Sequence, residues 1–139
     1  MNAALLLAAC LSAIAGLLHV GIILGGPRWY RLFGAGERMA RGAEAGRAFP
    51  TVITTAIAAM LFVWAAYGLS GAGAIQPLPF LKPALCAITA VYLLRGLALI
   101  PLMTFARSKA TPFLVWSSMV CLGYGTFHLI GLMQVWNRF

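Results

Sequence analysis

The stretch AALLLAACLSAIAGLLHVGIIL, at about residues 3–24, contains no Asp, Glu, Lys or Arg. Three further stretches have the same apolar character, at about residues 51–69, 84–105 and 112–135. A run of roughly 20 apolar residues is long enough to cross the hydrocarbon core of a bilayer as an α-helix. The sequence therefore predicts four transmembrane helices.

The composition of the whole chain also favours a membrane location. Hydrophobic residues make up 63% of the 139 residues and charged residues only 9%. A water-soluble domain of this size could not cover its surface with so few charges. Four spans and their connections account for the chain, so we expect one integral membrane domain over residues 1–139. The expected fold is an all-α membrane protein with its four transmembrane helices in an antiparallel bundle.

Positive charge is distributed unequally between the two sides of the predicted spans. The first and third loops contain seven Lys and Arg residues, against two on the opposite side. The seven are Arg28, Arg31, Arg38, Arg41, Arg47, Arg107 and Lys109, and the two are Lys82 and Arg138. Loops rich in Lys and Arg stay in the cytoplasm. We therefore expect a multi-pass protein of the bacterial inner (cytoplasmic) membrane with both termini in the periplasm.

The first loop, residues 27–47, is predicted to contain an amphipathic helix that lies in the membrane interface. A helix beginning at Pro27 would place apolar side chains on one face and arginines on the other. Those faces comprise Trp29, Leu32, Phe33, Met39 and Ala40 against Arg28, Arg31, Arg38 and Arg41. A break is expected near Gly34-Ala35-Gly36, because glycine weakens a helix. The alternative is a solvated basic connector that only sets the topology.

Arg95 is the charged residue nearest the middle of a predicted span. An arginine at the bilayer centre costs about 2.5–3.5 kcal/mol, so such a residue usually faces a partner or a cavity. His19 and Glu37 are expected at a similar depth, in the cytoplasmic half. Together with Tyr92, one helical turn before Arg95, they are the candidate ligand-binding residues for an anionic or amphiphilic ligand. The alternative is structural: Arg95 caps carbonyls near Pro101, and His19 is a hydrogen-bonded packing residue.

No cofactor, metal site or catalytic group is predicted. The three cysteines, Cys10, Cys86 and Cys121, lie in separate spans and form no CxxC pair. His128 is expected in the outer half of its span, so it is a poor partner for His19 in a haem site. Anionic lipid headgroups are the expected counter-charge for the net charge of +8. Nucleic acid is excluded as a partner because no nucleic-acid-binding motif accompanies the basic residues.

Two stretches, HVGIILGGPRWYRLFGAGE at His19–Glu37 and YLLRG at Tyr92–Gly96, carry a resemblance. The chain resembles a group of small four-helix bacterial inner-membrane proteins, similar in size and layout to DoxX-like proteins. That resemblance implies the location and the layout, and it brings no activity with it. Arg41–Pro50 and Arg95 are loosely similar to the arginine-rich segments of the MAPEG group of glutathione-using membrane enzymes. The chain lacks the Asn and Glu which that group has before the proline.

Three classes of function are weighed. We expect a binding protein or accessory subunit that holds a lipid, an anionic amphiphile or a membrane-protein partner at a cytoplasm-facing polar site. Small residues on the first helix, among them Gly21 and Gly25, favour helix association, either within the chain or with a second copy. A small anion or amphiphile transporter is the first alternative. The second is an enzyme acting on a lipid-like substrate, with His19 or Glu37 as acid or base. It is less favoured because the sequence offers no metal-ligand set and no nucleophile–base pair.

The predicted orientation can be tested with a reporter fused to the C-terminus. Because the C-terminus is expected in the periplasm, a reporter that is active only in the cytoplasm should be silent, whereas the same reporter in the first loop should be active. An active C-terminal fusion would reverse the topology.

Overall fold

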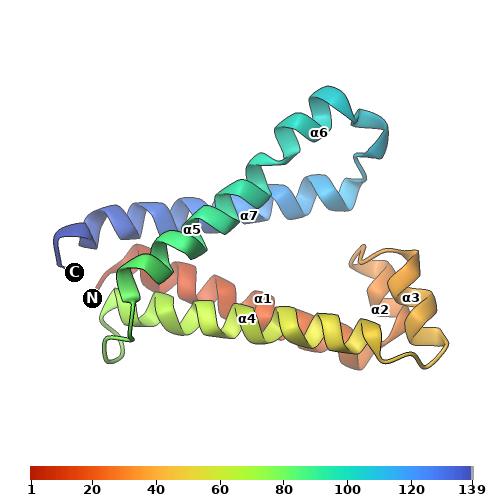
Figure 1. Ribbon diagram of the computed structural model, residues 1–139, viewed down its shortest axis with the longest axis horizontal. Coiled ribbons are helices and arrows are strands. Elements are labelled where there is room, and N and C mark those ends of the chain that lie inside the picture. The colour runs from red at the N-terminus through yellow and green to blue at the C-terminus, as the bar shows by residue number, and fades with distance from the viewer. Residues whose placement is uncertain (139) are drawn as a thin grey trace. The chain divides into compact units, whose positions relative to one another are not determined.

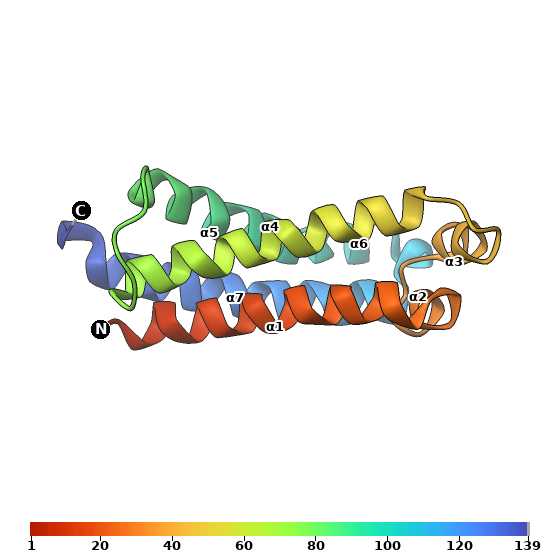
Figure 2. The same cartoon turned by 90° about the horizontal axis from the view of Figure 1, so that it is seen from below.

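The structure is a computed structural model that describes residues 1–138, and every regular element in that range is helical (Figures 1 and 2). The helices are α1 (Ala3–Gly25), α2 (Pro27–Leu32), α3 (Glu37–Glu44), α4 (Phe49–Ala72), α5 (Leu81–Leu97), α6 (Leu99–Phe105) and α7 (Pro112–Val135), with 3-10 turns at Arg107–Lys109 and Trp136–Arg138. Four helical segments are long and apolar enough to cross a membrane: α1, α4, α5 continued by α6, and α7 with the turn that follows it. The predicted all-α class and its four transmembrane helices are confirmed.

The chain divides into two compact units. The loop unit is Ser12–Val63, and the terminal unit is Met1–Leu11 together with the chain from Trp64 onward. Helices α1 and α4 are each divided between the two units, with one part of the helix in each. The single membrane domain expected from the sequence stays a prediction.

The terminal unit has a core to which four helices contribute. Leu5 of α1 packs with Ala72 of α4, Leu85 of α5, and Leu132 and Val135 of α7, all of which are buried. Figure 1 shows the N- and C-terminal ends of the chain at the same end of this unit. A cluster built from four helices is the arrangement of a four-helix bundle.

Close contacts in the terminal unit give the relative directions of its helices. A Cβ atom added to Gly68 of α4 would lie 2.9 Å from the Cβ of Ala9 in α1. Between α5 and α7, Gly96 contacts Leu122 and Gly125 contacts Leu93. Because residue numbers rise along α5 as they fall along α7, the two helices are antiparallel.

The sequence predicted one continuous helix for the third span, at residues 84–105, but the structure divides this span into two helices. Helix α5 ends at Leu97, and α6 begins at Leu99. Pro101 has no N–H to donate to the carbonyl of Leu97, and its ring clashes with that carbonyl. No residue of α6 is buried. The break is therefore a local consequence of the proline.

The loop unit ends in a corner formed by α2 and α3. Tyr30 of α2 and Ala40 of α3 are buried against Ile22 of α1. The Thr54 hydroxyl donates to the Pro50 carbonyl at 2.7 Å, so the Tyr30 hydroxyl is the donor in its 3.1 Å bond to Thr54 Oγ1. These contacts attach both short helices to the long ones.

The helix predicted in the first loop is present, in two parts. Helix α2 ends at Leu32 and α3 begins at Glu37, so the break falls at the predicted Gly34-Ala35-Gly36. Gly36 has a φ of 98°, a conformation that residues with a Cβ rarely adopt. The expected position of these helices in the membrane interface stays a prediction.

Candidate functional site

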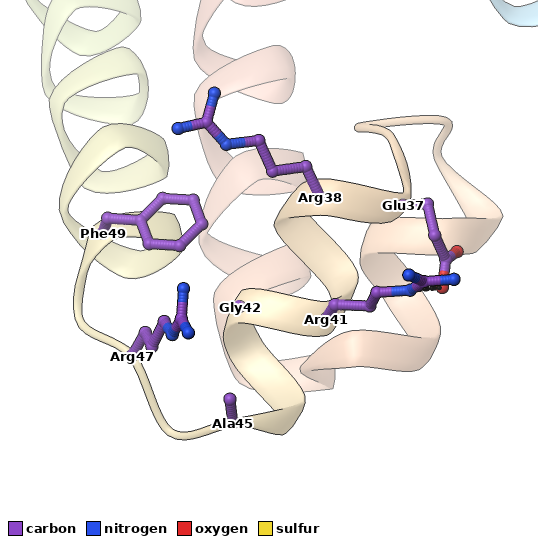
Figure 3. Close-up of a pocket in the computed structure, with 7 residues that line it drawn as sticks. All are labelled: Glu37, Arg38, Arg41, Gly42, Ala45, Arg47 and Phe49. Atoms are coloured by element: carbon purple, nitrogen blue, oxygen red, sulfur yellow. Dashed lines mark hydrogen bonds and ion pairs between the residues drawn. The ribbon is translucent and has the colours of Figure 1, made fainter.

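An open pocket of about 830 Å³ lies beside α3 in the loop unit. We call it the arginine pocket. Its lining residues come from α3, from the turn after it, and from the first residue of α4 (Figure 3). They are Glu37, Arg38, Arg41, Gly42, Ala45, Arg47 and Phe49. Figure 3 shows Arg38 and Arg47 flanking the ring of Phe49, with Glu37 and Arg41 together toward the other end.

Gly42 brings the wall of the pocket close to the start of α4. A Cβ atom at Gly42 would lie 2.5 Å from Cζ of Phe49 and 2.9 Å from Cγ of Pro50. Real Cβ atoms essentially never come that close to another heavy atom, so the position has room only for glycine unless both Phe49 and Pro50 move. The guanidinium carbon of Arg38 lies 5.7 Å from the centroid of the Phe49 ring, within cation–π range.

Arg31 of α2 binds both acidic side chains of the chain. Its Nε donates to Glu37 Oε2 at 3.1 Å, one Nη donates to Glu37 Oε1 at 3.0 Å, and the other donates to Glu44 Oε1 at 2.6 Å. Arg41 adds a 3.2 Å bond from its Nε to Glu37 Oε1. The fork of a guanidinium matches a carboxylate in this two-bond geometry. We call this network the Arg31 clamp.

Because the clamp uses both carboxylates of the chain, the arginines outside it keep an uncompensated charge. Its hydrogen bonds lower the pKa of both Glu37 and Glu44 below the usual value and raise the pKa of Arg31. Both carboxylates are therefore ionised at neutral pH and already occupied. Within residues 1–138, Arg38 and Arg47 form no ion pair.

The free arginines suit the arginine pocket to an anion. Arg38 and Arg47 have charged N–H groups available, and Arg41 uses only its Nε in the clamp. Guanidinium groups bind phosphate and carboxylate oxygens in pairs of parallel hydrogen bonds. Phe49 adds an apolar wall, so an anion that carries an apolar group fits this lining better than a simple ion does.

Two of the four residues predicted to bind ligand lie in the loop unit, and they have different surroundings. Glu37 lines the arginine pocket and belongs to the Arg31 clamp. His19 is half-buried, and its Nδ1 lies 2.7 Å from the carbonyl oxygen of Ala15. Because a carbonyl only accepts, Nδ1 carries the proton in this bond. That contact is the one expected of a structural histidine.

The other two predicted residues lie in the terminal unit. Arg95 is exposed and donates to the Ser117 and Ser118 hydroxyls, at 3.0 and 2.9 Å. Tyr92 is buried and stacks on the buried ring of His128, with 5.5 Å between ring centroids. His19 and Glu37 thus belong to one unit and Tyr92 and Arg95 to the other. The sequence left open whether His19, Glu37 and Arg95 converge, and the role of the four residues in ligand binding stays a prediction.

Arg38, Arg41 and Arg47 were not among the site residues predicted from the sequence. They were interpreted there as determinants of topology and as the polar face of a helix. A signal was nevertheless present: Arg38 and Arg41 are three apart and share one face of a helix, and Arg47 lies two residues before the aromatic residue that begins α4. What the sequence lacks is the fold of the corner, which brings these side chains around one pocket.

Comparison of the chain with protein-family models, curated proteins and solved structures finds no match. Within residues 1–138, no group of three His, Cys, Asp or Glu side chains could hold a metal ion. A proposal about function therefore rests on the residues of the site themselves.

Acidification should loosen the α2–α3 corner. Glu37 and Glu44 have folded-state pKa values below their ordinary 4.5. The clamp therefore contributes fully above that pH and is lost as the pH falls through the lowered values. Hydrogen–deuterium exchange, corrected for intrinsic rates, should show α3 protection that is constant from about pH 7 to pH 5 and falls below about pH 4.

The matched control is the double variant Glu37→Gln/Glu44→Gln, which has no carboxylate to titrate in the corner. Its α3 amides should be poorly protected at neutral pH and should not respond further to acid. If the variant loses protection on acidification as steeply as the native chain does, another group is responsible and the assignment to the clamp fails.

Proposed function

We propose that this protein is a multi-pass protein of the bacterial inner membrane that binds the anionic headgroup of a phospholipid in the arginine pocket. One observation carries the proposal: three arginines line a pocket at Phe49, and Phe49 is the first residue of a segment long and apolar enough to span a membrane. In this proposal the pocket faces the cytoplasm and both termini face the periplasm, in accordance with the excess of Lys and Arg in the first and third loops.

The position of the pocket along the chain supports a headgroup as the ligand. Lipid phosphates lie just beyond the ends of a hydrocarbon core about 30 Å thick. A pocket at the end of a candidate span is therefore at the depth of the phosphates. The cytoplasmic leaflet carries anionic lipids, which attract basic segments close to the membrane.

Exposed apolar side chains at the end of α2 and the start of α4 support a lipid over a soluble phosphate compound. Val52 and Ile53, in the first turn of α4 after Phe49, are exposed, as is Leu32 at the end of α2. A phospholipid places its acyl chains against such residues while its phosphate meets the arginines. A soluble phosphate compound would make no contact of this kind.

The other functions considered from the sequence remain predictions. They are transport of an anion or amphiphile, catalysis on a lipid-like substrate, and association with a second copy or another membrane protein. Each of them needs a feature beyond the arginine pocket, such as a continuous pore, a reacting pair of side chains or a binding surface.

The proposal can be tested by measuring lipid binding to the purified protein in a neutral detergent, where no charged surface contributes. Phosphatidylglycerol should bind more tightly than phosphatidylcholine. The double variant Arg38→Gln/Arg47→Gln should bind it at least tenfold more weakly, which corresponds to about 1.4 kcal/mol. Loss of two charge-assisted hydrogen bonds to phosphate is the reason.

Arg28→Gln/Arg107→Gln is the matched control, because it removes the same net charge from arginines that do not line the pocket. It should bind phosphatidylglycerol as the native chain does. Equal weakening in both double variants would mean that binding follows overall charge. No weakening in either would remove the arginine pocket as the site.

A further inference from the structure

Arg95 is a basic residue inside a candidate span, and the structure gives it two neutral partners. It lies on α5, and its guanidinium donates to Ser118 Oγ at 2.9 Å and to Ser117 Oγ at 3.0 Å on α7. Ser118 is buried, while Arg95 itself is exposed. We call these three side chains the Arg95 triad. All of them belong to the terminal unit.

The triad leaves the charge of Arg95 without a counter-charge. Hydroxyl groups accept hydrogen bonds but carry no negative charge. The three ion pairs within residues 1–138 all involve Arg31 or Arg41. A guanidinium has five N–H groups, and two of them are used here. At membrane depth such a charge is expected to mark a ligand or ion site.

Close packing of α5 and α7 holds the triad in position. A Cβ atom on Gly96, the residue after Arg95, would lie 2.8 Å from the backbone nitrogen of Leu122. That contact fixes the register in which Arg95 meets Ser117 and Ser118. Beyond Ala98 the chain continues as α6, which leaves α7 in Figure 1 and buries none of its residues. The triad thus lies where the two helices begin to separate, and its arginine is accessible.

The depth of Arg95 restricts the kind of anion that can reach it. It lies ten residues before Phe105, the end of the candidate span. At 1.5 Å per residue this is about 15 Å, roughly half of a hydrocarbon core about 30 Å thick. Counted along α7 from Pro112 to Ser118, the bonded partner lies about 9 Å inside the span. By either count the triad lies within the hydrocarbon core, where the phosphate of a bilayer lipid does not normally lie. A single-chain amphiphile with a small headgroup has no such restriction.

We propose that the Arg95 triad binds the carboxylate of a single-chain amphiphile, of the fatty-acid class, within the membrane. A carboxylate supplies the missing negative charge and accepts two parallel bonds from one guanidinium. Leu94 and Leu97 on α5 and Met119 on α7 are exposed apolar residues close to the triad in sequence, and they provide contacts for an alkyl chain. This site does not rest on the proposed function, because it lies in the other unit from the arginine pocket.

The test is equilibrium binding of oleate to the purified native protein in neutral detergent at neutral pH, counted by native mass spectrometry. Oleyl alcohol is the matched probe, with the same chain and no charge. Oleate should bind about tenfold more tightly than the alcohol, and Arg95→Gln should remove that difference, as expected when a charged hydrogen-bonded pair is lost. Arg95→Lys keeps the positive charge but loses the two-bond geometry of the guanidinium. Its affinity for oleate should lie between those of the native chain and Arg95→Gln.

Two further variants distinguish binding at the Arg95 triad from binding at the arginine pocket. Ser117→Ala/Ser118→Ala keeps Arg95, so it tests the triad even if Arg95→Gln does not assemble; oleate should bind it about threefold more weakly, because Arg95 is less well positioned. Arg38→Gln/Arg47→Gln removes any second oleate held by the arginine pocket, and the oleate that remains should keep its preference over the alcohol, whatever happens to phosphatidylglycerol binding. The proposal is overturned if oleate binds Arg95→Gln and Ser117→Ala/Ser118→Ala as tightly as it binds the native chain. It is also overturned if oleyl alcohol binds the native chain as tightly as oleate does, or if only Arg38→Gln/Arg47→Gln loses oleate binding.

Discussion

The corner of this protein depends on one interaction: Arg31 binds the carboxylates of both Glu37 and Glu44. The clamp joins α2 to the beginning and the end of α3 across a glycine-containing break, which local helix propensity alone would leave loose. It also satisfies all the acidic side chains that the sequence contains. The arginines left over, Arg38 and Arg47, therefore keep their charge beside the pocket. The same contact thus joins the helices of the corner and leaves the arginines on which the proposed anion site rests.

Polar groups in the spans gain from partners, and some have them, although neither ring nitrogen of the buried His128 has a hydrogen-bond partner within residues 1–138. The Thr54 hydroxyl donates a hydrogen bond to the carbonyl of Pro50 and accepts one from the hydroxyl of Tyr30. Arg95 meets two serine hydroxyls, which satisfy hydrogen bonds but leave its charge in place. The loop unit thus pairs its acidic groups fully, whereas the terminal unit has no acidic side chain and presents Arg95 inside a candidate span without a counter-charge. These two arrangements are the basis of the anion site that we propose in each unit.

The four spans, the loop helix and its break at Gly34-Ala35-Gly36 could be predicted from the sequence, because hydropathy and glycine content act locally. The contact of Glu37 with Arg41, four residues away on the same helix, could also be predicted. The two-bond contact with Arg31 could not, because Arg31 lies on another helix. Gly21 and Gly25 were expected to serve helix association, within the chain or with a second copy, and both lie against the indole of Trp29 in α2. The arginine pocket was missed for the same reason, since it exists only when α3 folds back beside Phe49.

The most direct test of this account is the affinity of the single variant Arg31→Gln for phosphatidylglycerol, compared with Arg31→Gln/Glu37→Gln/Glu44→Gln. Arg31 does not line the pocket, but without it both carboxylates are free to pair with the pocket arginines. We predict that the single variant binds this lipid about tenfold more weakly than the native chain, a change of about 1.4 kcal/mol. The triple variant frees the pocket arginines but still lacks the clamp, so it should recover part of the affinity. Native affinity in the single variant, or no recovery in the triple variant, would contradict the account.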